Sequence, residues 1–427
     1  MDFATSTDSA VQRQLDRLGT LSVPDGRLGL GTIRALLARL GDPHLRLPPA
    51  FHVAGTNGKG STCAFLRAML EAEGYRVHVT TSPHLVRYNE RIRVAGELIS
   101  DARLAKLLAE VLDAGEELNP SFFEVTIAAA FLEFARVPAD ACVIEVGLGG
   151  RFDATNVLED PAACGIASLG IDHERFLLAP EAGTPEQPMA RIAFEKAGIA
   201  KRGVPLVTLP AEHYPPEAHD SIAEVAFRTG APLNDTVQCV SIIEGCATLL
   251  DCVEGEAVLR PALPGLHQLS NAALAATMLL IQDRVPISPK SIVAGALRAR
   301  WPARLQRLSD GPLTDGRELW LDGGHNSDAG AMLARHFAGR RVHLVIGMLA
   351  NKNPAALLGP MRDSLASVTA VPVPRHDHHP ASAFGGGAAP DVPAALEGLP
   401  RDALPVLVAG SLYLAGEVLR LNGELPD

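Results

Sequence analysis

His52-Val53-Ala54-Gly55-Thr56-Asn57-Gly58-Lys59-Gly60-Ser61-Thr62 is the stretch from which the fold of this 427-residue chain can be worked outward. An apolar, strand-like run (50–54) leads into a turn with three glycines and one lysine, and a helical pattern follows. Glycines allow the backbone to approach phosphate oxygens, and the N-terminus of the next helix offers N–H groups and a positive dipole. Lys59 adds a point charge, and Ser61 or Thr62 a hydroxyl for nucleotide-bound Mg²⁺. The stretch predicts a phosphate-binding loop; its spacing differs from the general P-loop motif, which leaves an ordinary strand-to-helix turn as the alternative.

Composition limits the class of protein. A hydrophobic content of 47% excludes a largely disordered chain, and the length allows two or three domains. The net charge of −11 argues against general nucleic-acid binding, because such proteins concentrate basic surface. The six cysteines form no Cys-x-x-Cys pair, which favours buried free thiols in a reducing compartment. The start lacks an apolar signal core and the longest apolar stretch (272–281) is half a membrane span, so we expect a cytoplasmic protein without membrane or nucleic-acid partners.

Strand-like and helix-like runs alternate along most of the chain, which is typical of a doubly wound parallel sheet. After two opening helices (10–18 and 30–40), the strands expected in the first part are 76–81, 141–146, 164–169 and 205–209, with helices that include 101–112 and 125–134. Residues 233–260 suit a small antiparallel appendage. We therefore expect an α/β fold of two domains: an N-terminal P-loop domain (1–300) with a mostly parallel sheet, and a smaller Rossmann-like α/β domain (301–427).

The second domain has fewer predicted elements. Its expected strands are 319–321, 342–346 and 406–409, and its expected helices are 327–337 and 411–421. The segment 382–390 contains three consecutive glycines and predicts a flexible loop. His376, Asp377, His378 and His379 precede it, and because adjacent residues rarely converge on one ion, a solvated loop is favoured over a metal site.

Polar residues in the first domain fall where predicted strands end. Glu145 closes one apolar strand, Ser82 follows another, and Asp172 and His173 follow a third. Buried polar groups need partners, and a hard cation beside nucleotide phosphates would serve all of them, since Mg²⁺ prefers oxygen ligands. The alternative is that each of these residues caps a turn or a helix.

Motifs in a fixed order extend this pattern over most of the chain. They are 52–62, 82–85, 122–124, 145–151 with 153–156, 172–173, 195–198, 267–268 with 271–272, 301–305, 321–326, 347–349, and 410–412 with Glu417. Together they resemble the folylpolyglutamate synthase/dihydrofolate synthase family, relatives of the Mur ligases. The sequence departs from the family pattern in the distance from His173 to Lys196, which are 23 positions apart because of a Pro- and Glu-rich stretch (178–188), and in Arg27, where an acidic residue is common.

The resemblance implies a set of site residues. It implies ATP binding by Thr56, Asn57, Gly58, Lys59, Gly60, Ser61, Asn271, Arg304 and Asp322, and catalytic roles for Lys59, Lys196 and His325. It implies a pterin site at Leu28, Gly29, Ser121, Phe122, Phe123, Glu124, Phe152, Asp153 and Ala154. Two Mg²⁺ ions are implied, with Ser82, Glu145, His173 and a carbamylated Lys196 as ligands. A carbamate turns the lysine into an anion that can bind the second ion.

The function implied is a bifunctional one in folate biosynthesis and one-carbon metabolism. An enzyme of this family would ligate L-glutamate to dihydropteroate and to the γ-carboxyl of reduced folates, using ATP and an acyl-phosphate intermediate, and a monomer is expected. Two alternatives stay open: a Mur-type ligase of a cell-wall precursor, and a nucleotide-binding switch without ligase activity. The phenylalanine pair 122–123 suits a flat pterin and argues against the first, and Arg304, Asp322 and His325 have no evident use in the second.

Overall fold

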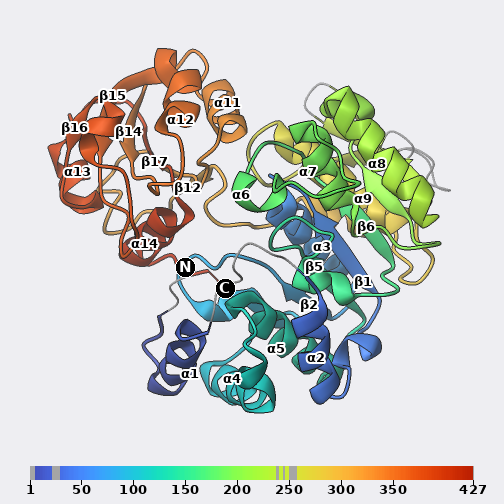
Figure 1. The fold of residues 1–427 in the computed structure, drawn as a ribbon. Helices are drawn as coiled ribbons and strands as arrows, with labels where there is room; N and C mark the ends of the chain where they lie inside the picture. The colour runs from blue at the N-terminus through green and yellow to red at the C-terminus, as the bar shows by residue number, and fades with distance from the viewer. Residues whose placement is uncertain (1–4, 22–28, 237–239, 244–245, 250–256, 427) are drawn as a thin grey trace. The chain divides into compact units, whose positions relative to one another are not determined.

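The computed structural model describes residues 5–21, 29–236, 240–243, 246–249 and 257–426. The chain divides into two compact units, one formed by Met1–Ala262 with Gln268–Arg300 and the other by Leu263–His267 with Trp301–Asp427. Each unit has its own sheet (Figure 1). The mixed α/β fold with a large and a smaller sheet confirms the predicted fold class.

The sheet of the first unit has eight strands in the order β4-β3-β2-β5-β1-β6-β7-β8. The strands are β1 (Ala50–Ala54), β2 (Val77–Thr80), β3 (Ile92–Val94), β4 (Glu97–Leu98), β5 (Ala141–Glu145), β6 (Ala163–Ile166), β7 (Leu206–Thr208) and β8 (Leu233–Asp235). Pairing is parallel from β2 to β8, and β3 and β4 add an antiparallel edge. Every residue of β1 and β5 is buried, as expected of central strands in a sheet covered on both faces.

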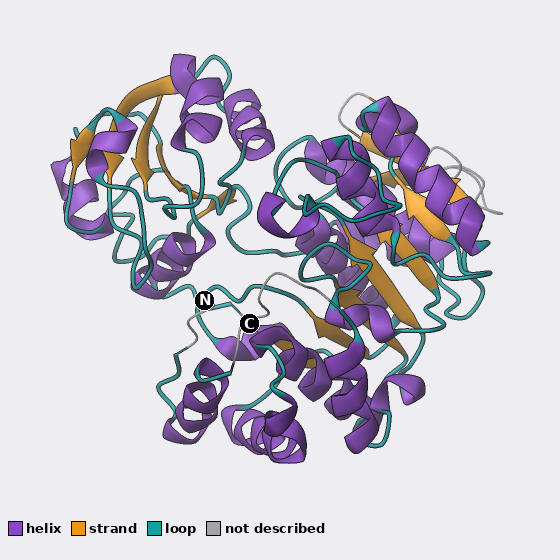
Figure 2. Ribbon diagram, viewed as in Figure 1, coloured by secondary structure: helices purple, strands orange, loops and turns teal. Residues whose placement is uncertain are grey.

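Helices flank these strands, as Figure 2 shows. They are α1 (Ser9–Gly19), α2 (Gly31–Arg39), α3 (Lys59–Glu73), α4 (Asp101–Gly115), α5 (Phe122–Arg136), α6 (Glu174–Leu177), α7 (Pro188–Ala197), α8 (Pro216–Thr229), α9 (His267–Leu280) and α10 (Pro289–Ala296). Helix α10 packs on α3, and α7 packs on α8. At the first contact Gly295 has no room for a side chain, because a β-carbon would collide with the backbone of Met69. The close approach of α3 and α10 therefore requires glycine.

The predicted appendage is present but smaller than expected. Strands β9 (Val240–Ile243), β10 (Cys246–Leu249) and β11 (Ala257–Leu259) form a three-stranded antiparallel sheet, and β11 packs on α10. Residues 233–235, which we assigned to the appendage, instead form β8, the parallel edge strand of the large sheet. That part of the prediction was wrong because the edge position of a short, half-buried strand leaves no strong apolar pattern.

The sheet of the second unit has six strands in the order β12-β13-β17-β14-β15-β16. The strands are β12 (Gln306–Arg307), β13 (Leu319–Leu321), β14 (Val342–Ile346), β15 (Leu365–Ala370), β16 (Gly387–Ala388) and β17 (Val406–Ala409), and the helices are α11 (Ser327–His336), α12 (Pro354–Met361), α13 (Val392–Gly398) and α14 (Leu412–Asn422). Only β12 pairs antiparallel. The predicted strands 319–321, 342–346 and 406–409 are confirmed.

The segment 382–390 is not the flexible loop that its glycines suggested. It contains the end of a 3-10 helix (Ala381–Phe384) and β16, which pairs with β15, and the Phe384 side chain is buried. The prediction was wrong because backbone pairing with β15 orders the glycine run, and β15 itself was missed because its side chains are mostly half-buried and include polar residues.

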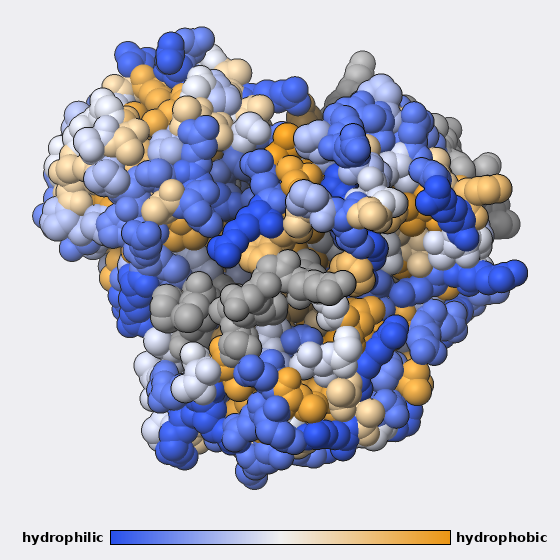
Figure 3. Space-filling view, viewed as in Figure 1, coloured by the Kyte–Doolittle hydropathy of each residue, from blue (hydrophilic) through white to orange (hydrophobic). Residues whose placement is uncertain are grey.

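The surface carries no extended apolar face in the view of Figure 3, where hydrophilic residues cover most of the area and hydrophobic ones lie in small groups between them. The most exposed large hydrophobic side chain among the described residues is Phe227 on α8, at 88%. Single exposed apolar residues are ordinary in folded chains. In the described parts of the chain, no helix has both the length and the apolar character needed to cross a membrane.

Candidate active site

The predicted phosphate loop connects β1 to α3, which begins at Lys59. Gly58 caps α3 at a φ of 85°, and Gly55 has a φ of 149°. A β-carbon on Gly55 would lie 2.9 Å from the β-carbon of Ala167, which follows β6. The backbone N–H of Thr56 donates to the Ser168 carbonyl at 2.8 Å and anchors the loop to the same segment. The glycines are thus required both by backbone conformation and by the close approach of the neighbouring strand.

Two lysines converge on this loop. Lys59 Nζ donates to the carbonyl oxygens of Gly55 at 3.0 Å and Thr56 at 3.2 Å, and Lys196 Nζ, from the last turn of α7, donates to the same Gly55 oxygen at 2.9 Å. Lys196 is only 4% exposed. Burial, and then the nearby charge of Lys59, lowers the pKa of Lys196 to about 7. The predicted catalytic residues Lys59 and Lys196 therefore share one carbonyl.

The remainder of the predicted phosphate loop continues into the first turn of α3. Gly60 and Ser61 are buried in the first turn of α3, and the Thr62 N–H donates to the Gly58 carbonyl at 2.8 Å. Asn271, on α9 of the same unit, approaches Gly58 so closely that a β-carbon there would collide with Asn271 Oδ1. Its amide nitrogen donates to Gln268 Oε1 at 3.0 Å, and Gln268 is 1% exposed. Gln268 orients Asn271, a role that the sequence motif did not reveal.

Of the predicted metal ligands, Glu145 and Ser82 lie together. Glu145 ends β5, is 4% exposed, and accepts the backbone N–H of Ser82 at 3.0 Å. His173 caps α6 with a φ of 53°, and its Nε2 lies 3.9 Å from Asp172 Oδ2. The described residues contain no group of three or more His, Cys, Asp or Glu that could hold a metal ion. A carboxylate and a hydroxyl still fit Mg²⁺, which takes few protein ligands and keeps several waters.

Among the predicted pterin residues, those at the start of α5 cap the helix. Ser121 Oγ accepts the Glu124 N–H at 3.2 Å, and Glu124 Oε2 accepts the Ser121 N–H at 2.8 Å. The Phe123 ring packs on Gly147, where a β-carbon would lie 2.5 Å from the ring. The Phe122 ring meets the Tyr88 ring edge to face, and the guanidinium of Arg91 lies 5.2 Å from its centroid, so both phenylalanines of this turn are partly buried against the protein. Gly29 is described, and Leu28 and Arg27 lie outside the described residues.

Asp153 and Ala154 are buried in the loop that follows β5. Asp153 Oδ2 accepts the Leu148 N–H at 2.8 Å, and Oδ1 accepts the Thr155 N–H at 3.0 Å and the Thr155 hydroxyl at 2.5 Å. The Thr155 hydroxyl lies 2.8 Å from Nε2 of His52 on β1, a contact that sequence reasoning missed. Burial raises the pKa of Asp153. Asp153 therefore shapes its own loop, and Phe152 beside it is half-buried.

The second unit gathers the remaining predicted ATP residues where β13 ends. Asp322 is 2% exposed and accepts the backbone N–H groups of Leu305 at 2.8 Å and Gly324 at 2.7 Å. Burial raises its pKa, while the charge of Arg304 opposes the shift. His325 Nδ1 lies 3.1 Å from the carbonyl oxygen of Gly323. Arg304, Asp322 and His325 thus share one edge of this unit's sheet.

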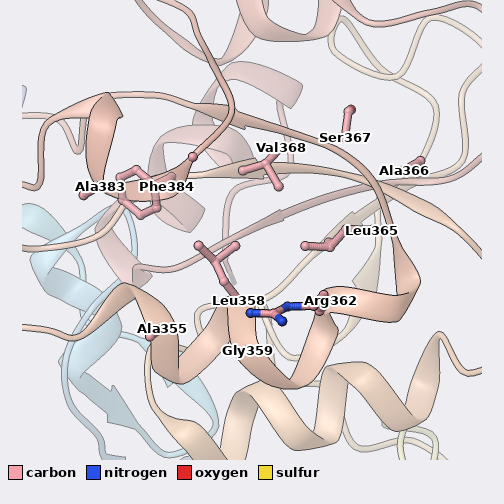
Figure 4. Close-up of a pocket in the computed structure, with 11 residues that line it drawn as sticks. Ala355, Leu358, Gly359, Arg362, Leu365, Ala366, Ser367, Val368, Ala383 and Phe384 are labelled. Carbon is pink, nitrogen blue, oxygen red and sulfur yellow. The ribbon is translucent and has the colours of Figure 1, made fainter.

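A depression of about 610 Å³ lies elsewhere in the second unit, beside α12 and β15 (Figure 4). Leu358, Arg362, Val368 and Phe384 are among its lining residues, and Figure 4 shows Arg362 as the charged one. The predicted site residues are outside this depression, which spans 355–368 and 383–385.

Comparisons with known proteins agree with the motifs. No family model matches the chain. A dihydrofolate synthase/folylpolyglutamate synthase of Bacillus subtilis is 40% identical over 350 residues, 76% of each chain. The solved structure of E. coli FolC in complex with DHPP and ADP has a TM-score of 0.83 at 30% identity and covers 97% of this chain and 98% of its own. A bifunctional folylpolyglutamate synthase/dihydrofolate synthase with Mn, AMPPNP and L-glutamate bound has a TM-score of 0.81 at 29% identity, over 97% and 99% of the two chains.

Sequence identity and fold point the same way, and both extend over most of the chain. The chain belongs to the folylpolyglutamate synthase/dihydrofolate synthase family of the Mur ligase superfamily.

Proposed function

We propose that this chain is an ATP-dependent ligase that joins L-glutamate to dihydropteroate and to the γ-carboxyl of reduced folates. The observation that carries the proposal is the convergence of Lys59 and Lys196 on the Gly55 carbonyl, at the end of a central parallel strand. Ligands of such sheets bind beyond the carboxyl ends of the strands. Relatives solved with ADP, or with AMPPNP, Mn and L-glutamate, support this choice of substrates.

The reaction begins with transfer of the γ-phosphoryl group of ATP to the substrate carboxylate. Backbone N–H groups at the start of α3 and the ammonium of Lys59 neutralise phosphate charge as it shifts during transfer. The resulting acyl phosphate is attacked by the amine of L-glutamate, which forms the amide and releases phosphate. Phosphoryl transfer depends mainly on positioning and charge neutralisation, so Asn271, held against Gly58 by Gln268, acts by fixing the nucleotide.

Mg²⁺ is the metal proposed for this site, with Glu145, Ser82 and His173 as ligands. Bound there, Mg²⁺ would neutralise phosphate oxygens during the transfer. Glu145 is buried at the end of β5 and already orients the backbone of Ser82, which supports its role as the central ligand.

Lys196 is proposed to carry a carbamate that binds a second Mg²⁺. Carbamylation joins the neutral amine to CO₂ and releases a proton, so it needs a lysine that is not held as an ammonium. The burial of Lys196 at the phosphate loop disfavours the charged form, and its pKa of about 7 has the required direction. Density for three extra atoms on Nζ in a crystal with ATP and Mg²⁺ would support the carbamate. An unmodified amine in that complex would overturn it.

The second unit is proposed to serve the same reaction. Arg304 and Asp322 would bind ATP and His325 would lie near the reacting groups, which gives this cluster a use that a simple nucleotide switch lacks.

We further propose that the enzyme acts as a monomer in the cytoplasm. The pterin end of the substrate would meet Gly29, Phe122, Phe123 and Phe152, and the Ser121–Glu124 cap and the buried residues Asp153 and Ala154 would hold the backbone around these contacts.

One assay tests the function against its rivals. Release of ADP and phosphate is measured with ATP alone, then with L-glutamate and dihydropteroate, and then with L-glutamate and tetrahydrofolate. The proposal expects turnover only when both the pterin substrate and glutamate are present. Turnover with ATP alone would favour a nucleotide switch, and no turnover with either pterin substrate would overturn the folate ligase and favour a Mur-type ligase.

A further inference from the structure

The loop that follows β5 holds the predicted pterin residues Phe152, Asp153 and Ala154, and we call it the pterin loop. A cluster of four charged side chains lies at this loop. It consists of Arg151, Glu181, Arg191 and Glu195, and we call it the charge cluster. Both carboxylate oxygens of Glu181 accept hydrogen bonds from Arg151, Oε1 from Nη1 at 3.1 Å and Oε2 from Nη2. Glu181 Oε2 also lies 3.1 Å from Arg191 Nη2. On the other side, Glu195 lies 2.8 Å from Arg151 Nη2 and 3.0 Å from Arg191 Nη2. Each arginine therefore touches both carboxylates.

Glu181 belongs to the long connection between α6 and α7, and Arg151 lies in the loop that follows β5. Arg191 and Glu195 are on α7 and are 5% and 4% exposed. Arg191 Nε also donates to the carbonyl of Leu177 at 3.1 Å, where α6 ends. Without Glu181, two guanidinium groups would share the single buried carboxylate of Glu195. The carboxylate of Glu181 balances the second guanidinium charge, so the four side chains together are neutral. This matters because burying an unbalanced charge is unfavourable.

Arg151 connects the charge cluster to the pterin loop, because it contacts both carboxylates and also the ring of Phe152. Its backbone N–H donates to the Glu195 carbonyl at 2.7 Å, and its guanidinium lies 4.1 Å from the ring centroid of Phe152 and 5.0 Å from that of Phe194. A β-carbon on Gly198 would collide with Arg151, so the loop and the end of α7 are in close contact. A guanidinium held between two carboxylates and stacked on an aromatic ring restricts that ring's position.

We propose that Glu181 is a positioning residue for the pterin substrate, acting through Arg151 on the ring of Phe152. The segment that supplies it is the stretch 178–188, the insertion that lengthens the path between His173 and Lys196. This inference rests on the proposed function, because Phe152 is a substrate contact only if the chain binds a pterin. Glu181 does not touch the substrate, so its effect is on substrate affinity rather than on the chemical step.

The test compares Glu181→Gln with Glu186→Gln in the full-length protein. Both changes remove one carboxylate charge from the same segment, and Glu186 is exposed and has no ion pair or hydrogen bond among the described residues. For Glu181→Gln we expect KM for dihydropteroate to rise about five-fold, the upper range for a partly exposed ion pair. KM for ATP and kcat should stay within about two-fold of wild type, and Glu186→Gln should match wild type throughout.

Each other outcome overturns the inference. An unchanged KM for dihydropteroate in Glu181→Gln would show that the charge cluster does not act on the substrate. A fall in kcat or a rise in KM for ATP of the same size would show a general structural effect. A comparable change in Glu186→Gln would assign the effect to the net charge of the segment.

Hydrogen exchange separates this inference from the proposed function. The amide of Arg151, bonded to the Glu195 carbonyl, should exchange faster in Glu181→Gln than in Glu186→Gln, with amides of the β1 strand unchanged. If the wild type fails to use dihydropteroate, the proposed function fails, and the same exchange data still decide whether Glu181 holds the loop. Equal exchange in the two variants overturns the positioning role.

Discussion

Replacing Lys59 by alanine should nearly abolish turnover while leaving the fold intact. In the structure Lys59 Nζ donates hydrogen bonds to the carbonyl oxygens of Gly55 and Thr56. The Gly55 oxygen also accepts from Lys196 Nζ, so it keeps one hydrogen bond when Lys59 is removed. The loss of such hydrogen bonds costs about 1 kcal/mol net, so the melting temperature should fall by only about 2–4 °C. In the transition state the ammonium neutralises phosphate charge, and the loss of one such group costs about 3–4 kcal/mol, or roughly a hundredfold to a thousandfold in kcat.

The assay is release of ADP at saturating ATP, Mg²⁺, L-glutamate and dihydropteroate, paired with thermal unfolding of the same samples. Lys290→Ala is the matched control, because Lys290 is an exposed lysine on α10 that makes no hydrogen bond or ion pair among the described residues. It should retain wild-type turnover. Lys59→Ala that keeps more than about a tenth of wild-type kcat would refute the phosphate-loop assignment, and a large loss of thermal stability would return Lys59 to a structural role.

Three further predictions test other parts of the site. Glu145→Gln and His173→Ala should each raise the Mg²⁺ concentration that gives half-maximal activity, more strongly for Glu145 because a charge is lost; an unchanged Mg²⁺ dependence in both would make them structural caps. Purified protein should extend both dihydropteroate and tetrahydrofolate at saturating ATP and glutamate, and activity on tetrahydrofolate alone would contradict bifunctionality. Burial, with the charge of Lys201 acting in the same direction, lowers the pKa of His52 from 6.5 to about 3. The unfolded state therefore binds more protons below pH 6.5, and the free energy of unfolding should fall by about 2 kcal/mol from pH 7 to pH 5 on account of this residue. Measured by urea unfolding, the free energy of unfolding should fall less between pH 7 and pH 5 in His52→Gln than in the wild type. An equal fall in both proteins would show that His52 does not cause it.

Central strands and the phosphate loop could be predicted from the sequence because their causes are local. The run 50–54 is buried along its whole length and stands in the middle of the sheet, so its apolar character is continuous. Gly58 needs a positive φ and a helix follows directly. Strands at a sheet edge, or next to one, were harder to predict: β8 and β16 are short edge strands and β15 is half-buried beside β16, so backbone pairing with a neighbour decides their structure. Because that neighbouring strand is distant in the sequence, no local pattern of residues predicts the pairing.

The same limit applies to the site. Motifs predicted site roles for Lys59, Lys196 and Glu145, but not that both lysines would donate to one backbone oxygen, because every residue has a carbonyl group and the sequence does not show which one a side chain will contact.

Asp153 shows the limit most clearly. Its motif indicated a substrate contact, whereas in the structure its two oxygens accept Leu148 and Thr155 from the same loop, and Thr155 is held in turn by His52 on β1. His52 stands in the phosphate-loop stretch and Asp153 in the pterin loop, so this hydrogen-bond chain joins the two predicted binding segments. A polar residue in a functional motif can therefore serve by joining two binding loops, and only the three-dimensional contacts distinguish that role from direct binding.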